Sequence, residues 1–193
     1  MVIEDYIPGD TLEEILAREG SLPEAQVLDI AIQLCRILQA FYHAVPPIVN
    51  RDIKPSNIKL TEGGIVKLLD MNAAKYCDCL AAMDTVLLGT QGYAAPEQYG
   101  FGASNVQTDI YAVGVLMNVL RTGKLPAEQK ASGKLRGIIV KCTKLAPEQR
   151  YSSIDSLLAA LSALKPGSTS DTPNESGWRR FLPPGFRSGN LLL

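Results

Sequence analysis

One short stretch in the first third of the chain combines three side chains that suit phosphoryl transfer. Asp52 is followed two residues later by Lys54 and five residues later by Asn57. A carboxylate in such a site accepts a hydroxyl proton, an ammonium neutralises a transferring phosphate, and an amide oxygen can bind Mg²⁺. The alternative interpretation is a polar turn before a strand, because Asp, Pro, Ser and Asn all favour turns.

Four further segments with recognisable residue patterns follow the stretch that contains Asp52, Lys54 and Asn57. They are Lys-Leu-Leu-Asp-Met-Asn at 67–72, Gly-Thr-Gln-Gly-Tyr-Ala-Ala-Pro-Glu at 89–97, Asp-Ile-Tyr-Ala-Val-Gly-Val at 109–115 and Pro-Glu-Gln-Arg-Tyr at 147–151. Together with the first run they resemble the catalytic loop, metal-binding segment, activation-segment end, buried helix and late arginine turn of the eukaryotic-type, bacterial Hanks-type serine/threonine protein kinases. We therefore expect a transferase that uses ATP and Mg²⁺ and acts on Ser/Thr hydroxyls of a protein substrate.

The resemblance assigns a role to each chemical side chain. Asp52 corresponds to the catalytic base, and Lys54 to the catalytic lysine that contacts the phosphate of the nucleotide. Asn57 and Asp70 correspond to the magnesium ligands, whose hard oxygens suit that ion. The segment from Met1 to Leu12 resembles the last small-lobe strand and the interlobe hinge, and within it the nucleotide-contacting positions are Asp5 and Ile7.

Other matched residues correspond to supporting positions. Thr90 resembles the threonine that orients the catalytic aspartate and lysine. Glu97 and Arg150 match a buried ion pair, and Asp109 matches a carboxylate that receives backbone amides of the catalytic loop. Loss of one partner from a buried pair costs roughly 3 to 5 kcal/mol, so these positions are expected to matter for folding.

Arg51, directly before Asp52, suggests regulation by phosphorylation. In kinases that carry this arginine, it often binds a phosphate placed on the activation segment. We expect Thr85 to be the acceptor, because it lies between Asp70 and Glu97 and a phosphate would add nearly two negative charges for the guanidinium to bind.

The resemblance implies a protein-kinase-like fold that consists of the C-lobe only. No Gly-x-Gly-x-x-Gly precedes Asp52, so the small lobe is expected to be largely missing and to be supplied by an upstream segment or a partner. We expect residues 1–10 to be a hinge and strand remnant, 11–165 the lobe, and 166–193 a linker and tail.

Local patterns predict a mainly α structure with one small β-hairpin. Thr11 and Glu14 form a capping box for a helix to about Glu19, and Ser21 to Glu24 repeat this pattern before a long apolar stripe that ends ahead of Pro46. Strands at 58–60 and 65–69 flank a turn and should bring Asn57 and Asp70 together. Further helices are expected at 106–121, 133–143 and 152–164, with room for only a shortened helix between Arg121 and Lys134.

Two departures from the family pattern lie beside the expected chemistry. Asn50 replaces the usual histidine, and Met71-Asn72 replaces Phe-Gly. Asn tolerates positive φ and Met fills apolar gaps, so we interpret the changes as a loosened regulatory core. They also leave open a second hypothesis, a non-catalytic kinase-like binding or regulatory module. The single histidine, His43, matches a structural position.

Bulk properties favour a cytoplasmic domain. The net charge of -1 gives no reason to expect a nucleic-acid partner. Glu4 and Asp5 near the start do not fit a secretory signal. Cys77 and Cys79 leave metal or redox chemistry open, but reduced free thiols are the more ordinary interpretation.

The end of the chain suggests membrane association, with a disordered tail as the alternative. Residues 166–177 are typical of a flexible linker, and residues 178–187 are basic and aromatic. If the tail binds membranes, the full chain should float with anionic liposomes and a chain lacking residues 178–193 should not. Equal flotation of the two would contradict the membrane hypothesis.

Overall fold

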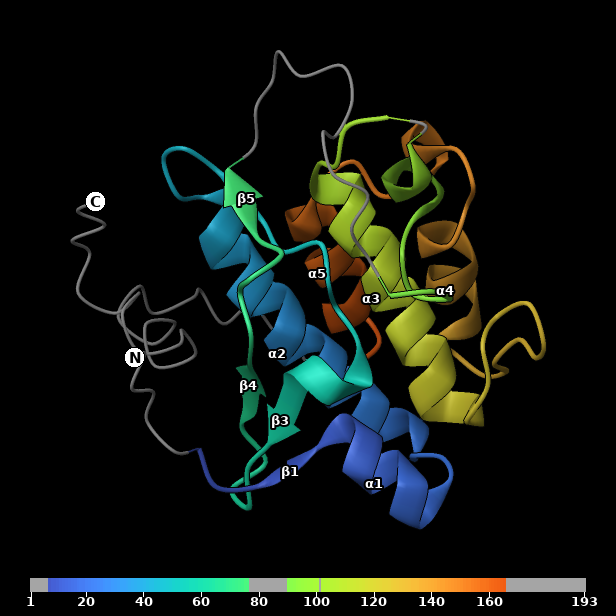
Figure 1. The fold of residues 1–193 in the computed structure, drawn as a ribbon. Coiled ribbons are helices and arrows are strands. Elements are labelled where there is room, and N and C mark those ends of the chain that lie inside the picture. Colours follow the sequence, from blue (N-terminus) through green and yellow to red (C-terminus); the bar gives the residue numbers. More distant parts are fainter. Residues whose placement is uncertain (1–6, 77–89, 101, 166–193) are drawn as a thin grey trace.

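Helices are the predominant regular elements in this computed structural model, which describes residues 7–76, 90–100 and 102–165 (Figure 1). The predictions for Asp5, Thr85, Cys77, Cys79 and the tail fall outside the described residues. The mainly α composition with small sheets agrees with the sequence prediction.

The first helix begins at the predicted capping box. Strand β1 (Asp10–Thr11) leads into α1 (Leu12–Glu19). The Glu14 N–H donates to Thr11 Oγ1 at 3.2 Å, and the Thr11 N–H donates to Glu14 Oε2 at 2.7 Å. This reciprocal pair satisfies two of the backbone donors that a helix start leaves open.

The second predicted capping box is wrong. Pro23 lies at the N-cap of α2 (Glu24–Tyr42) and no side chain caps this helix start. The Glu24 carboxylate instead accepts a hydrogen bond from the Lys134 N–H at 2.9 Å. A long-range backbone donor has therefore replaced the local partner that the sequence pattern suggested.

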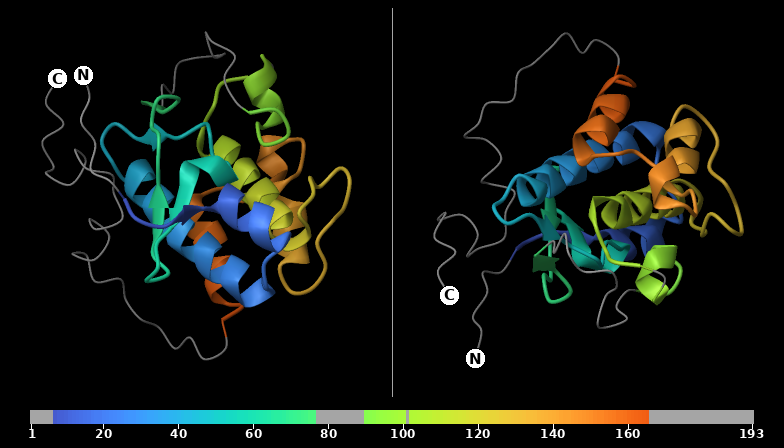
Figure 2. Two further views of the ribbon diagram at one scale, coloured as in Figure 1. Left: turned by 60° about the horizontal axis from the view of Figure 1, so that its bottom comes forward. Right: turned by 90° about the horizontal axis from the view of Figure 1, so that it is seen from above.

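Helix α2 is the centre of the core. Its apolar stripe is buried as predicted, and the helix ends at Tyr42, before the prolines. It packs against α3 (Val106–Thr122) and α5 (Ile154–Ser162), an arrangement seen in both views of Figure 2. The predicted helices at 106–121 and 152–164 thus agree with α3 and α5 to within about two residues at each end, the usual scatter of helix bounds.

The predicted hairpin is present and lies on α2. Strands β3 (Ile58–Leu60) and β4 (Val66–Leu68) pair antiparallel with Ile58 opposite Leu68, and β1 adds to β3 to give the order β1-β3-β4. Ile58, Val66 and Leu68 are almost fully buried, so one face of this sheet belongs to the core. A second small sheet pairs β2 (Ile48–Val49) with β5 (Lys75–Tyr76).

Helix α4 (Arg136–Cys142) approaches α3 closely at one glycine. A Cβ on Gly114 would lie 2.4 Å from the Cys142 Cβ, so only glycine fits there. Burial raises the pKa of the Cys142 thiol to about 12 and raises the pKa of Cys35 as well. These two described cysteines are free, protonated core residues.

The segment between α3 and α4 contains no helix, so the shortened helix considered from the sequence is absent from these described residues. A fully buried amide on α3 organises the segment instead. Asn118 Nδ2 donates to the carbonyls of Lys124 at 2.9 Å and Gln129 at 2.8 Å, and its Oδ1 accepts from the Ala131 N–H at 2.8 Å. One side chain thus satisfies backbone groups that a helix would have paired internally.

None of the described helices is both long and apolar enough to cross a membrane. The long helix α2 uses its apolar stripe in the core instead.

Replacing Asn118 by alanine should destabilise the protein. The Gln129 carbonyl and the Ala131 N–H lose their partner, whereas the Lys124 carbonyl still accepts a hydrogen bond from Thr122 Oγ1. An unsatisfied buried group costs about 1 to 3 kcal/mol, so two of them predict a loss of about 2 to 6 kcal/mol in the free energy of unfolding. Urea denaturation measures this loss. Gln129→Ala is the control, because only its backbone takes part, and an unchanged midpoint for Asn118→Ala would contradict the assignment.

Candidate active site

A buried carboxylate ties the loop after β2 to helix α3. Asp109, in the first turn of α3, accepts hydrogen bonds from the Asn50 N–H at 2.8 Å and the Arg51 N–H at 2.9 Å. The Tyr42 hydroxyl donates to the same carboxylate at 2.8 Å. Burial raises the pKa of Asp109, while these three donors favour its charged form. The carboxylate fixes the backbone directly before Asp52.

The backbone at Arg51 is held in an uncommon conformation. Its φ of 74° lies in the left-handed region, which costs a residue with a side chain about 1 to 3 kcal/mol. Asp109 holds its N–H, and Gln98 Nε2 donates to its carbonyl at 2.9 Å. Gln98 belongs to η2 (Pro96–Tyr99), so the end of the 89–97 segment also fixes this turn. The sequence analysis did not predict this role for Gln98.

The structure brings three of the predicted residues into direct contact with the Asp52 carboxylate. Thr90 Oγ1 donates to Asp52 Oδ1 at 2.8 Å. Lys54 Nζ lies 2.8 Å from Asp52 Oδ2 and donates to Thr90 Oγ1 at 2.9 Å. Asn57 Nδ2 donates to Asp52 Oδ2 at 2.9 Å and to the Asp52 carbonyl at 3.0 Å. The Lys54 and Asp52 side chains keep 24% and 19% of their surface exposed, so an external group can reach them.

Local structure explains why these side chains converge. Lys54 is the extended residue before the short 3₁₀ helix η1 (Pro55–Asn57), and proline at the start of η1 fixes that turn. Asn57 ends η1 and leads directly into β3. The chain thereby folds back, so that the amide five residues after Asp52 meets it.

Asp70 lies at the same end of the hairpin but stands apart from this cluster. The Leu69 N–H donates to the Asn57 carbonyl at 2.7 Å, which continues the register of β3 and β4, so Leu69 lies opposite Asn57 and Asp70 follows one residue later. The exposed Asp70 has a φ of 44° and accepts the Asn72 N–H at 2.9 Å. In this part of the chain no described hydrogen bond or ion pair joins its carboxylate to Asp52, Lys54 or Asn57.

The chemistry of Asn57 and Asp70 fits a magnesium ion. Asn57 donates through its nitrogen to Asp52, and no hydrogen bond to its amide oxygen is found among the described residues, so this oxygen suits a metal ligand. Asp70 adds an exposed carboxylate, and Mg²⁺ prefers a few such oxygens together with water and phosphate. Among the described residues no group of three or more His, Cys, Asp or Glu side chains could hold a metal by itself.

The predicted partners Glu97 and Arg150 form a buried, bidentate ion pair. Arg150 Nη1 donates to Glu97 Oε1 at 2.7 Å and Nη2 donates to Oε2 at 3.0 Å. The guanidinium also donates to the carbonyls of Lys144, Leu145 and Gln107, which satisfies its remaining hydrogens. Because it is fully hydrogen-bonded, the pair can be buried without an orphaned charge. It joins η2 to η3 (Pro147–Gln149).

The two departures from the family pattern touch each other. Asn50 Nδ2 donates to Met71 Sδ at 3.4 Å, and Asn50 Oδ1 accepts the Asp52 N–H at 3.2 Å. The sequence suggested a positive φ at Asn72. In the structure Asp70 has the positive φ, and Asn72 does not. His43 caps α2 and lies 3.5 Å from Asp155, away from the cluster around Asp52.

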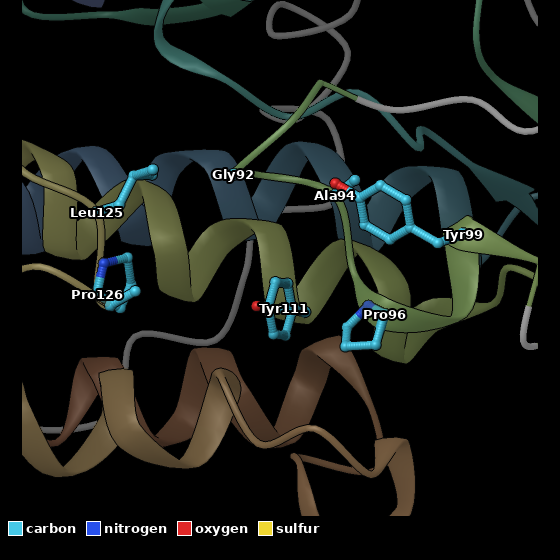
Figure 3. Close-up of a pocket in the computed structure, with 8 residues that line it drawn as sticks. Gly92, Ala94, Pro96, Tyr99, Tyr111, Leu125 and Pro126 are labelled. Carbon is cyan, nitrogen blue, oxygen red and sulfur yellow. The ribbon is translucent and has the colours of Figure 1, made fainter.

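An apolar hollow of about 380 Å³ begins two residues after Thr90. Figure 3 shows Leu125 and Pro126 on one side of it, Pro96 and Tyr99 on the other, and Tyr111 of α3 between them. The segment held by Asn118 forms one wall. The hollow thus combines the end of the 89–97 segment with the helix-free connection between α3 and α4.

The chain belongs to the protein kinase family. Residues 1–166 match the sequence profile described as the protein kinase domain. This match includes every described residue of the cluster around Asp52 and all residues that position it.

Several curated relatives are bacterial serine/threonine-protein kinases. A probable serine/threonine-protein kinase of Clostridium perfringens is 25% identical over 95% of this chain and 31% of the relative. A probable kinase named PknB of Corynebacterium glutamicum is 35% identical over 66% and 20%, and serine/threonine-protein kinase A of Synechocystis is 27% identical over 84% and 38%. The chain therefore spans less than two fifths of the length of each of these relatives.

Changing Asp109 to asparagine should loosen the loop before Asp52. An amide offers one acceptor oxygen where the carboxylate offers two, so at least one of the Asn50 and Arg51 N–H groups loses its partner, at a cost of about 1 to 3 kcal/mol. Hydrogen exchange should accelerate at residues 50 and 51. The surface change Asp29→Asn should alter stability by less than about 0.5 kcal/mol. Unchanged protection at both amides would refute this role.

Proposed function

We propose that this chain supplies the catalytic large lobe of a serine/threonine protein kinase, which transfers the γ-phosphoryl group of ATP to a hydroxyl of a protein substrate. The observation that carries the proposal is the contact of Lys54, Asn57 and Thr90 with the Asp52 carboxylate. Phosphoryl transfer depends on positioning and on charge stabilisation, and this cluster offers both.

The residues of the cluster divide the work of the reaction. Asp52 accepts the proton of the substrate hydroxyl, and Lys54 neutralises charge on the phosphate. Thr90 holds both side chains through its hydroxyl. Asn57 and Asp70 hold Mg²⁺, which when bound neutralises the phosphate oxygens.

A protein substrate suits the surface next to the cluster. The apolar hollow lined by Tyr99, Tyr111, Leu125 and Pro126 also includes Gly92, two residues after Thr90 in the chain. Apolar side chains of a polypeptide would bury surface there while a nearby hydroxyl reaches Asp52. By the family resemblance, Ile7 and Asp5 would contact the nucleotide, and the Arg51 guanidinium would bind a phosphate carried by Thr85.

The nucleotide site needs more than this lobe. We infer that an upstream segment or a partner supplies a small lobe with the phosphate loop and the anchoring lysine, because no Gly-x-Gly-x-x-Gly precedes Asp52 in this sequence. Without that roof ATP binds weakly, and we propose a cytoplasmic location close to the membrane for the assembled kinase.

A non-catalytic kinase-like module is the second candidate. The contact between Asn50 and Met71 favours it, because both residues depart from the family pattern at positions that flank the chemistry. The separation of the Asp70 carboxylate from the cluster points the same way. Such a module would use the same fold to bind a partner.

A radiolabelled-ATP assay decides between the two candidates. The protein with its upstream coding sequence restored should phosphorylate itself or a general protein substrate, and the 193-residue chain should show negligible turnover. Asp52→Asn in the longer protein should lower the rate by about 10² to 10⁴, whereas Asp29→Asn should not. A longer protein with no activity, or one indifferent to Asp52→Asn, would favour the binding module.

A further inference from the structure

The sheet β1-β3-β4 carries two lysines on the face that is turned away from the core. Lys59 and Lys67 lie directly opposite each other in the antiparallel pair β3 and β4. Their neighbours Ile58 and Leu68 are buried on the other face, next to α2. Because side chains alternate along a strand, both ammonium-bearing chains extend from the half-buried outer face.

Lys59 makes a specific contact on this face. Its Nζ donates to the carbonyl of Ile7 at 2.8 Å. The link spans 52 residues of sequence and joins the hairpin to the segment before β1. A hydrogen bond from an ammonium to a carbonyl is stronger than one between neutral groups, so it competes with any ligand that needs the same place.

The position of this contact matters because Ile7 and Asn57 mark the two ends of the proposed nucleotide site. Asn57 ends the 3₁₀ helix η1, and Lys59 is the middle residue of the strand β3 that follows, so the strand leads away from Asn57 and the Lys59 side chain reaches Ile7. A nucleotide with its base at Ile7 and its phosphates at Asn57 and Asp70 must pass over Lys59. The side chain of Lys59 therefore lies beneath the base end of the site.

We propose that Lys59 lowers the affinity of the site for adenine nucleotides, an inference that rests on the proposed function. A base presents flat apolar faces, which an apolar side chain supports and a charged chain does not. The ammonium also holds the Ile7 carbonyl, so a base that enters must displace or crowd this bond. The bond between Lys59 and the Ile7 carbonyl thus opposes binding of a base until another part of the kinase displaces the Lys59 side chain.

The test measures binding of ATP with Mg²⁺ to the full 193-residue chain by isothermal titration calorimetry. Lys59→Met keeps the length of the side chain but removes its charge and its bond to Ile7. We expect the Kd for ATP to fall about tenfold, which corresponds to the loss of one competing charge-assisted hydrogen bond. Lys59→Gln, which is neutral but polar, should change the Kd in the same direction.

Two matched controls separate this contact from a general effect of charge. Lys67→Met removes the same charge from the facing strand and leaves the Lys59 bond in place, so its Kd should stay within about twofold of the wild type. Lys59→Arg keeps the charge and should give no gain. Circular dichroism melting shows which variants are folded and belong in the comparison.

The outcomes are distinct from those of the kinase assay. Weaker or unchanged ATP binding by Lys59→Met and Lys59→Gln, including no binding by any variant, overturns the proposal for Lys59. If the longer protein still transfers phosphate in an Asp52-dependent manner, the proposed function stands and only the role of Lys59 falls. If both experiments fail, the nucleotide site itself is refuted.

Discussion

The site depends on one buried carboxylate at the start of α3. Asp109 gathers the backbone N–H groups of Asn50 and Arg51 and thereby sets the direction in which the chain enters Asp52. Gln98 completes the restraint by holding the Arg51 carbonyl. The left-handed turn at Arg51 is tolerable because both its backbone groups are paired inside the core. Asp109 thus helps to keep Asp52 beside Lys54, Asn57 and Thr90, together with the bonds from Asn57 to the Asp52 carbonyl and from the Asp52 N–H to Asn50.

Two chain segments with different supports meet at Asp52. Asn57 leads into the hairpin that packs on α2. Thr90 begins the segment that ends in η2, and the Glu97–Arg150 pair joins η2 to η3. The contacts around Asp52 can therefore form only when the hairpin and the segment that begins at Thr90 are both in position. A change far from Asp52, such as the loss of the pair at Glu97, can disturb the geometry of the cluster around Asp52.

Local patterns predicted much of the fold but little of the long-range bonding. The capping box at Thr11, the apolar stripe of α2 and the turn between β3 and β4 act within a few residues, so their physics is readable from spacing. The site residues were proposed from a family resemblance. The capping box predicted from Ser21 and Glu24 was wrong, because the Glu24 carboxylate accepts a hydrogen bond from the distant Lys134 N–H. The roles of Gln98, Asn118 and Lys59 depend on contacts across 11 to 52 residues, which no local spacing encodes.

The central claim is that Asn57 and Asp70 form the metal end of a nucleotide site next to Asp52. Paramagnetic broadening in nuclear magnetic resonance spectra tests it, with Mn²⁺ in place of Mg²⁺ and excess ATP added to the isotope-labelled chain. We predict that the resonances of Asn57, Leu69 and Asp70 broaden first, with Asp52 next. Broadening centred on another acidic region, such as Asp10 and Glu13, with the hairpin end unaffected, would contradict the account.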